Sequence, residues 1–516
     1  MYSEASRMSE NSSPAVSRRL SLASVCLFVA LLLGSATAQT VSQSTEPPKP
    51  VSGIGTAVQD QQSPPPSPKS QPAPPEVQKP ISKAQAKELF RSVDEILKFV
   101  SQDTGLPIRH KVKRKLITRD KVERYVEKRL KDDKDTQRLE RSQLVLKKFG
   151  MIPPDYDLHS EFLKLLSEQV AAYYDSKTKT VNLLDWVQPE LQKTVLAHEL
   201  THALQDQAVD LEKWGMAGEK DDLPLPDQQE QLVEEAQAAR QNVAEGQAMV
   251  AMIDYTLAPA GVNILTAPDA VNAMRAAMTD GKDAPVLASA PIFLRESLLM
   301  PYTFGLDFVR EVFSRKGKTA AFAGMLQRPP IDTRQVMEPD TYISRLDVTP
   351  PTIPDLDKLI MPDYQRYDFG GMGEYDIYLL AKQYAPDTDA KKYYTHWRGG
   401  YYLAVHAKSA PKEQIALFYF SRWDSPDAAL AFAKLYSSYV PKRYRLTDGG
   451  SPGMMGSVAT GDSTIEWDIG QQGKVVIQAH GDDVLILEGF NDATASRIRD
   501  ALLHGVSQAT PATAKP

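Results

Sequence analysis

The stretch VLAHELTHALQDQ, from Val195 to Gln207, carries the residues whose types and spacing best suit chemistry. His198 and His202 are four residues apart, a spacing that places both imidazoles on one face of a helix. Glu199 directly follows the first histidine. Two such imidazoles can reach one zinc ion, and the adjacent glutamate is placed to act as a general base. The pattern predicts a catalytic zinc site; the alternative is a chance pair of hydrogen-bonded core histidines.

A third ligand is needed, because catalytic zinc sites use three protein ligands and leave the fourth position to water. We predict Glu245, since its small neighbours in NVAEGQAMV would let two helices approach closely and a buried carboxylate needs a partner. Glu234 and Glu235 are its rivals, although their polar surroundings favour solvated charges. For Glu245 itself, the alternative is a salt bridge to Arg240.

Two helices and a hairpin should position these residues. An apolar pattern after a proline predicts a helix over 189–206, and a second helix is predicted over 228–253. The segment AAYYDSKTKTVNLL has aromatic and β-branched residues on both sides of a polar turn, which predicts a short β-hairpin. Ordered structure is expected to begin at the helix that Ser82 caps.

Composition limits the class of protein. The chain has 516 residues, enough for two or three domains, and a net charge of -6 that does not suggest a nucleic-acid partner. Its single cysteine, Cys26, lies in the apolar N-terminal run, so disulfides and thiolate metal sites are not expected in the mature protein.

The N-terminus has the features of an export signal. Arg18 and Arg19 precede an apolar run, and the small residues at 36–38 suit cleavage before Gln39. We therefore predict a signal peptide over 1–38 and a periplasmic or extracellular protein. An uncleaved anchor and a twin-arginine signal are the alternatives.

The remaining chain divides by composition. Residues 39–80 are proline-rich and are predicted to form a disordered linker, through which the protein would associate with the cell envelope. Residues 81–345 are helix-rich, whereas 363–505 alternate strand-like and helix-like segments. We expect an α+β protein, with a mainly helical domain containing a short hairpin followed by a small α+β accessory domain.

These motifs resemble those of the gluzincin branch of zinc metallopeptidases, the thermolysin-like superfamily. More narrowly, GMIPPDYDL, PYTFGLDFV and RPPIDTRQVMEPDTY are similar to segments of a poorly characterised group of secreted bacterial proteins of that branch. The likeness covers roughly residues 85–345. It implies a zincin-like catalytic domain over 81–345 and one Zn²⁺ per chain held by His198, His202 and Glu245. It also implies Glu199 as general base and a peptide or protein substrate paired along the hairpin edge.

Two departures from these relatives bear on activity. Thermolysin has an aspartate four residues after its glutamate ligand, where this chain has Met249, so another group must orient a histidine. The narrower group often has a histidine where this chain has Glu338. Tyr302 and Tyr342 are alternative oxyanion donors, although aromatic packing is the simpler interpretation of both. The rival function is a catalytically inactive, zinc-binding pseudo-peptidase or envelope binding protein.

Overall fold

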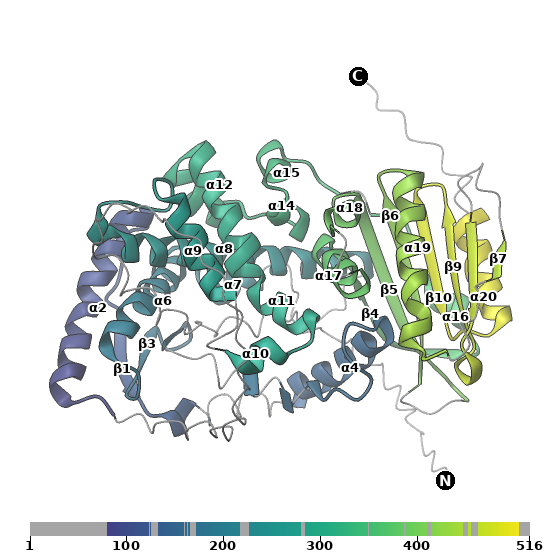
Figure 1. The fold of residues 1–516 in the computed structure, drawn as a ribbon, viewed down its shortest axis with the longest axis horizontal. Coiled ribbons are helices and arrows are strands. Elements are labelled where there is room, and N and C mark those ends of the chain that lie inside the picture. The colour runs from purple at the N-terminus through teal and green to yellow at the C-terminus, as the bar shows by residue number, and fades with distance from the viewer. Residues whose placement is uncertain are drawn as a thin grey trace, which may run out of the picture.

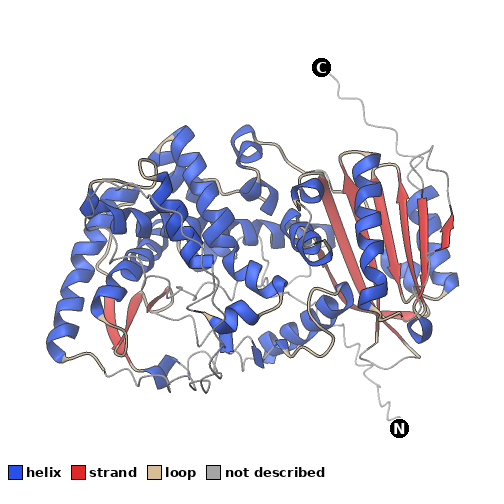
Figure 2. Cartoon of the chain, viewed as in Figure 1, coloured by secondary structure: helices blue, strands red, loops and turns tan. Residues whose placement is uncertain are grey.

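The computed structural model describes residues 80–504, apart from 123, 125–132, 159, 162–163, 166–171, 217–226, 280–283, 349, 386–388, 410–413, 447–452 and 456–462. The predicted signal peptide and nearly all of the predicted linker lie outside these residues. Before residue 346 the fold is mainly helical, with a small sheet (Figures 1 and 2). The helices of this part are α2 (Lys83–Thr104), α4 (Asp133–Phe149), α6 (Pro189–Val209), α7 (Leu211–Gly215), α8 (Asp227–Leu257), α9 (Pro268–Thr279), α10 (Pro285–Ser289), α11 (Ile292–Met300), α12 (Leu306–Lys316), α13 (Met325–Gln327), α14 (Thr333–Met337) and α15 (Pro339–Ser344).

Beyond residue 346 a large antiparallel sheet dominates, in the strand order β4-β5-β6-β10-β9-β8-β7. Its strands are β4 (Tyr364–Gly371), β5 (Trp397–Ala407), β6 (Ile415–Trp423), β7 (Gly453–Met455), β8 (Ser463–Asp468), β9 (Lys474–His480) and β10 (Asp483–Glu488). The helices of this part are α16 (Leu356–Ile360), α17 (Glu374–Tyr384), α18 (Lys391–Tyr394), α19 (Pro426–Arg443) and α20 (Asp492–Arg499). The predicted α+β fold class is therefore confirmed.

Both faces of the large sheet are covered, which explains why its central strands are almost continuously apolar. Tyr402 and Tyr419 belong to the core under α19, whereas their neighbours Tyr401 and Phe418 belong to a second core that includes residues of α16 and α20. Successive residues of a strand point to opposite faces, so each strand contributes to both cores. Figure 1 shows α19 along one face, with α16 and α20 on the other.

The small sheet supports the motif helix. It contains β1 (Lys113–Ile117), β2 (Ala172–Asp175) and β3 (Thr180–Leu184) in the order β1-β3-β2. The hairpin of β2 and β3 confirms the sequence prediction, whereas β1, which pairs with β3 in parallel, was not predicted. The buried Gln192 amide of α6 bonds the backbone N–H and C=O of Leu184, and so fixes the hairpin to the start of this helix.

Local signals set the ends of the helices near the site. Ser82 and Gln85 form a capping box at the start of α2, as expected from Ser82, and Gly105 ends the helix in the left-handed region with φ 75°. Pro189 begins α6, and Asp210 ends it at φ 57°. Among the described residues, no helix combines the length and apolar character that crossing a bilayer requires.

The helical segment that runs from Ile292 to Lys316 contains a defect. A π-helical turn, η3 (Pro301–Gly305), separates α11 from α12, and the backbone stays in the right-handed helical region throughout. Such turns are often found at functional sites. Two further irregular turns are the 3₁₀ turn η2 (Ala258–Ala260) and the π turn η4 (Ala320–Gly324), and another π turn, η7 (Asp500–His504), follows α20.

Candidate metal centre

The motif helix α6 is buried on nearly all sides from Val195 to Asp206. It packs between α2, α8 and the hairpin, so no face of this segment is left to solvent. His198 is 3 % exposed and His202 is 7 % exposed. Two imidazoles at this depth need polar partners, because burying a polar group without one is costly.

Three ligand atoms converge between α6 and α8. The distance from His198 Nε2 to Glu245 Oε2 is 3.1 Å, and from His198 Nε2 to His202 Nε2 it is also 3.1 Å. His202 Nε2 lies 3.5 Å from Glu245 Oε2. Ligands about 2.0–2.2 Å from a tetrahedral zinc ion would lie roughly 3.3–3.6 Å from one another. The structure thus brings together the three predicted ligands, and among the described residues they form a group able to hold a metal ion.

A chain of amides fixes the tautomer of His202. Gln247 donates its amide to the carbonyls of Ala321 and Phe322, so its Oε1 is an acceptor. Gln205 donates Nε2 to that oxygen at 2.9 Å, and its own Oε1 lies 2.9 Å from His202 Nδ1. The Nδ1 atom must therefore carry the proton, which leaves the Nε2 lone pair directed at the metal position.

Gln205 and Gln247 were not predicted, although the need for a group to orient a histidine was. Gln205 follows His202 by one helical turn, and Gln247 lies two residues after Glu245. Both side chains are fully buried. Both glutamines lie next to the predicted ligands, in HALQ and EGQA, but a glutamine in a helix is usually solvated, so the sequence alone did not indicate this role. Gln205 is thus the group that orients His202, a role that Met249 cannot fill.

The charges around the three ligand atoms require a cation. Burial alone would raise the pKa of Glu245, but the facing imidazoles outweigh burial and hold this pKa well below its usual range. Burial likewise would lower the pKa of His202, yet the Glu245 carboxylate outweighs it and raises that pKa. Either a proton or a metal ion satisfies this arrangement, so acid should compete with metal for it.

Glu199 is held beside this group by the hairpin. Its Oε2 accepts a hydrogen bond of 2.7 Å from the backbone N–H of Tyr174 on β2. Burial raises the pKa of Glu199, and the neighbouring histidines oppose this rise. The Tyr174 hydroxyl donates to Asp206 at 2.7 Å, so Tyr174 bonds α6 through both its backbone and its side chain. Glu199 thus lies near the three ligands without being one of the converging atoms.

The small residues around Glu245 serve a different contact from the one predicted. A Cβ atom on Gly246 would lie 2.3 Å from the Gly305 carbonyl oxygen, and one on Gly305 would lie 2.7 Å from the Asn242 carbonyl oxygen. Gly246 therefore permits close approach to the π turn η3 rather than to α6. On the α6 side, the Ala244 carbonyl accepts the Gln205 amide at 2.9 Å.

The two candidate tyrosines have separate positions. Tyr302 lies in η3, and its ring stacks on His198 with a centroid distance of 6.3 Å and an interplanar angle of 20°. Tyr342 lies edge-on to Phe308 and donates its hydroxyl to the Arg328 carbonyl at 2.8 Å. Tyr302 thus adjoins the candidate metal centre, whereas Tyr342 packs on Phe308 and uses its hydroxyl for the Arg328 carbonyl.

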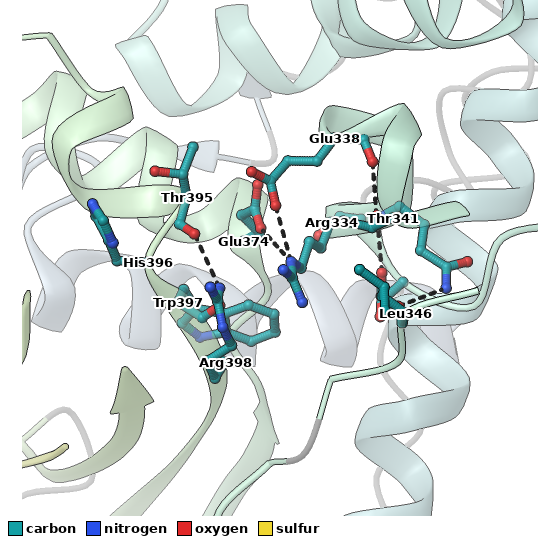
Figure 3. A network of polar contacts seen from close by, with 12 residues as sticks. Arg334, Glu338, Thr341, Leu346, Glu374, Thr395, His396, Trp397 and Arg398 are labelled. Carbon is teal, nitrogen blue, oxygen red and sulfur yellow. Dashed lines mark hydrogen bonds and ion pairs between the residues drawn. The ribbon is translucent and has the colours of Figure 1, made fainter. Parts of the chain in front are cut away.

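Glu338 belongs to a different polar network. It is the N-cap residue that precedes α15, and its carboxylate accepts a hydrogen bond of 2.9 Å from Arg334 Nε. The fully buried Glu374 carboxylate lies 3.7 Å from the same nitrogen. Figure 3 shows both carboxylates directed at Arg334, with Arg398 nearby. None of these contacts involves His198, His202 or Glu245, so the absence of a histidine at 338 does not remove a group from the three-ligand cluster.

The rivals of Glu245 are not at the metal centre, and one of them is not solvated. Glu235 is buried, which corrects the expectation of a solvated charge. Its Oε2 accepts hydrogen bonds from the backbone N–H and the hydroxyl of Thr333, at 3.0 and 2.8 Å. The preceding residue, Glu234, is half-buried. The polar residues around Glu235 in the sequence suggested solvent exposure, because its contact with Thr333 forms only when α14 packs on α8.

Comparisons with known proteins bear on the C-terminal part alone. Residues 362–499 match the model of a family described as a domain of unknown function (DUF8575). No curated protein matches the chain, and no solved structure does either. The matched region contains the large sheet and its helices, so the metal centre lies outside it.

Proposed function

We propose that the chain is a gluzincin-type zinc metallopeptidase that hydrolyses peptide bonds. The observation that carries this proposal is the convergence of His198 Nε2, His202 Nε2 and Glu245 Oε2 on one point, with the tautomer of His202 set by Gln205. The donor set of two imidazoles and one carboxylate is the one that catalytic zinc accepts with a position left for water. Zinc held there would supply Lewis-acid activation of the water and of the scissile carbonyl.

The chain's own groups supply the proton transfers. Because Tyr174 N–H holds Oε2 of Glu199, the other carboxylate oxygen is the one assigned to take the proton of the attacking water and to deliver it to the leaving amine. Tyr302, stacked on His198, is the nearest candidate to donate a hydrogen bond to the developing oxyanion.

The substrate would bind as an extended strand along β2. This strand is an edge of the small sheet, and such an edge can pair with a peptide. The outward N–H of Tyr174 is already bonded to Glu199, so pairing would use the remaining outward groups of β2. The same contact that fixes the base thus limits the register in which a peptide can align.

The test combines metal analysis with peptidase assays. The purified full chain should retain about one zinc per chain by mass spectrometry and should cleave members of a quenched fluorescent peptide library in a chelator-sensitive way. Glu245→Ala should lose the metal, whereas Glu234→Ala, eleven residues before Glu245 on the same helix and outside the ligand group, should keep it. Glu199→Gln should keep the metal and lose at least ~10²-fold in hydrolysis.

Each outcome discriminates between functions. A parent protein that retains no metal, or a Glu199→Gln variant as active as the parent, would contradict the peptidase proposal. Full metal occupancy without cleavage of any library member would favour the pseudo-peptidase, in which the same three ligands support binding alone.

A further inference from the structure

A second site lies away from the metal centre, between the ends of two helices. The last turn of α4 and the following segment GMIPP, at 150–154, form one wall of a groove with a volume of about 1190 Å³. The end of α19 forms the opposite wall. The groove is larger than the several hundred Å³ that a small ligand needs. Because one wall comes from α4 and the other from α19, the groove lies between the helical part and the region that matches DUF8575.

Hydrogen bonds connect the two walls, so the shape of the groove is fixed by the fold. Arg443 donates to the Lys148 carbonyl at 2.8 Å, and the Tyr384 hydroxyl donates to the Phe149 carbonyl. Gly150 has φ 73°, and a Cβ atom there would lie 2.7 Å from Arg443 Cδ. The glycine of GMIPP is thus required both by its backbone conformation and by the arginine that crosses it.

The groove is strongly basic. Five cationic residues line it, and no aspartate or glutamate is among its described lining residues. The five are Lys147, Lys148, Lys442, Arg443 and Arg445. This concentration contrasts with the net charge of -6 for the whole chain. A local reversal of sign in an acidic protein favours a short anionic ligand over a long polyanion, which the rest of the surface would repel.

Structural roles account for only part of this charge. Buried Glu488 pairs with Arg443 and neutralises it. The groove also receives the C-terminal ends of α4 and α19, and each helix end carries roughly half a negative charge. About three positive charges remain after these contributions. Among the described residues, the side chains of Lys147, Lys442 and Arg445 make no ion pair or hydrogen bond.

The uncharged residues that line the groove indicate the chemical class of its anionic ligand. Tyr156, Tyr439 and Tyr444 line the groove together with Gln414 and Gln472. The Tyr439 ring stacks on Tyr384, and Lys148 and Arg443 lie over the Tyr444 ring, which leaves Tyr156 as the ring that could face the C–H surface of a sugar. Each glutamine amide presents both a donor and an acceptor, which suits vicinal hydroxyls. Lysine and arginine suit carboxylates or phosphates.

We propose that this groove binds a short anionic oligosaccharide, with carboxylate or phosphate groups against Lys147, Lys442 and Arg445 and with a sugar ring against Tyr156. The proposal does not depend on the metal centre, because no ligand residue of that centre lines the groove.

The test measures binding of defined probes to the full chain by fluorescence anisotropy. The probes are a labelled galacturonate hexamer, a phosphate-linked oligosaccharide of equal length and a neutral galactose hexamer. We expect one or both acidic probes to bind in a salt-dependent way and the neutral probe to bind much more weakly. The arm that binds more tightly identifies carboxylate or phosphate as the acidic group.

A charge-matched pair of variants locates the site. In Lys147→Gln/Lys442→Gln/Arg445→Gln we expect the Kd for the acidic probe to rise at least about ten-fold, because the three positive charges that would pair with the acidic groups of the probe are removed. The control Lys391→Gln/Lys392→Gln/Lys434→Gln removes the same charge at exposed positions outside the groove, and its Kd should equal that of the parent. Circular dichroism checks that both variants fold.

Three results would overturn the proposal. They are an equal loss in both triple variants, no binding of either acidic probe, or a hexaglutamate peptide that binds as tightly as the acidic oligosaccharides. The last result would assign the groove to an acidic protein segment instead.

Discussion

Gln205 shows how this chain orients His202, one of the three candidate metal ligands, with a neutral group. Its amide oxygen receives the Nδ1 proton of His202, and its amide nitrogen is fixed by Ala244 and Gln247. A carboxylate in the same position would raise the basicity of the imidazole and add a negative charge beside Glu245. The neutral amide orients the ring without adding charge to a site that already holds a buried carboxylate.

Replacing this amide should weaken metal binding without abolishing the fold. In Gln205→Leu, His202 loses the acceptor that fixes its tautomer, and we expect zinc affinity to fall about 10–100-fold, the usual cost of losing such a partner. Competition with a chromophoric chelator measures this affinity directly, without any assay of activity.

Gln207→Leu is the matched control for this change. Gln207 lies on the same helix, and its side chain bonds the backbone of Arg109 and His110 rather than a ligand. Its loss should leave zinc affinity unchanged. Equal affinities for Gln205→Leu and the parent would show that His202 is oriented by other means.

Some residues of the candidate metal centre can be predicted from the sequence, and others cannot. His198, Glu199 and His202 could be selected because their spacing has a direct chemical meaning on a helix. Glu245 could be selected because a carboxylate among small residues implies burial. Gln205 could not, since nothing in the residue type separates a buried amide from a solvated one.

Among the elements, the crossing of α8 and the π turn η3 controls the position of Glu245. Gly246 and Gly305 meet with no room for a side chain at either position. The crossing also places Tyr302 on His198, because Tyr302 belongs to the same turn. The PYTFG motif thus has a positional reason: its glycine sets the helix contact and its tyrosine reaches the imidazole.

Adding one methyl group at this crossing should disturb both stability and metal content. In Gly246→Ala, the new Cβ would lie 2.3 Å from the Gly305 oxygen, so the backbone must shift. We expect a loss of about 2–3 kcal/mol in the free energy of unfolding and reduced zinc content, because Glu245 is the adjacent residue. Urea unfolding and metal analysis measure the two effects.

Gly215→Ala provides the comparison, because a Cβ atom there would meet nothing within 4 Å. Its stability should match or slightly exceed that of the parent, since alanine is favoured over glycine in a helix by roughly 0.5–1 kcal/mol. If the two alanine variants behaved alike, the contact between α8 and η3 would not be tight in solution.

The predictable elements were those with a clear local composition. The hairpin β2–β3 has aromatic and β-branched residues around a polar turn, α6 and α8 are long segments without an interior proline, and the central strands of the large sheet are short apolar runs. Strand β1 escaped prediction because three of its five residues are basic, and β4 because it ends in two glycines. The π turn leaves no signature, since its residues keep helical backbone angles.

On the scale of the whole molecule, Glu235 connects the helical part to the C-terminal part. Its carboxylate bonds Thr333 of α14, and any side chain at Gly373, next to α17, would collide with it. Burial raises the pKa of Glu235 to about 8, and the neighbouring Asp376 adds to this effect. The carboxyl group is therefore protonated in the folded protein near neutral pH.

This shift predicts a pH dependence of stability. The folded pKa of about 8 exceeds the ordinary value of 4.5, so the folded state binds the proton more tightly than the unfolded state does. The free energy of unfolding should therefore fall as pH rises from about 4.5 to 8, by at most a few kcal/mol, since one pKa unit corresponds to about 1.4 kcal/mol.

Urea unfolding across this pH range, in the parent and in Glu235→Gln, isolates the contribution. Glutamine resembles the protonated acid and cannot ionise, so the variant should lose less stability toward pH 8 than the parent. Asp254 and Glu374 also have raised pKa values, and they remain in both proteins. Parallel pH profiles would mean that Glu235 is ionised in the folded state.

The π turn between α11 and α12 also constrains how the chain can change its length. A π turn holds one residue more than an α-helical turn, so it rotates everything beyond it by about 100° relative to an uninterrupted helix. Before the turn, the Glu296 carbonyl accepts the Tyr375 hydroxyl of α17; beyond it, Val309 faces Gly246 of α8. Deleting one residue within 301–305 would restore a regular helix and leave those two contacts out of phase. An insertion or deletion here would thus rotate α12 relative to α11, whereas in a surface loop it would change only the length of the loop.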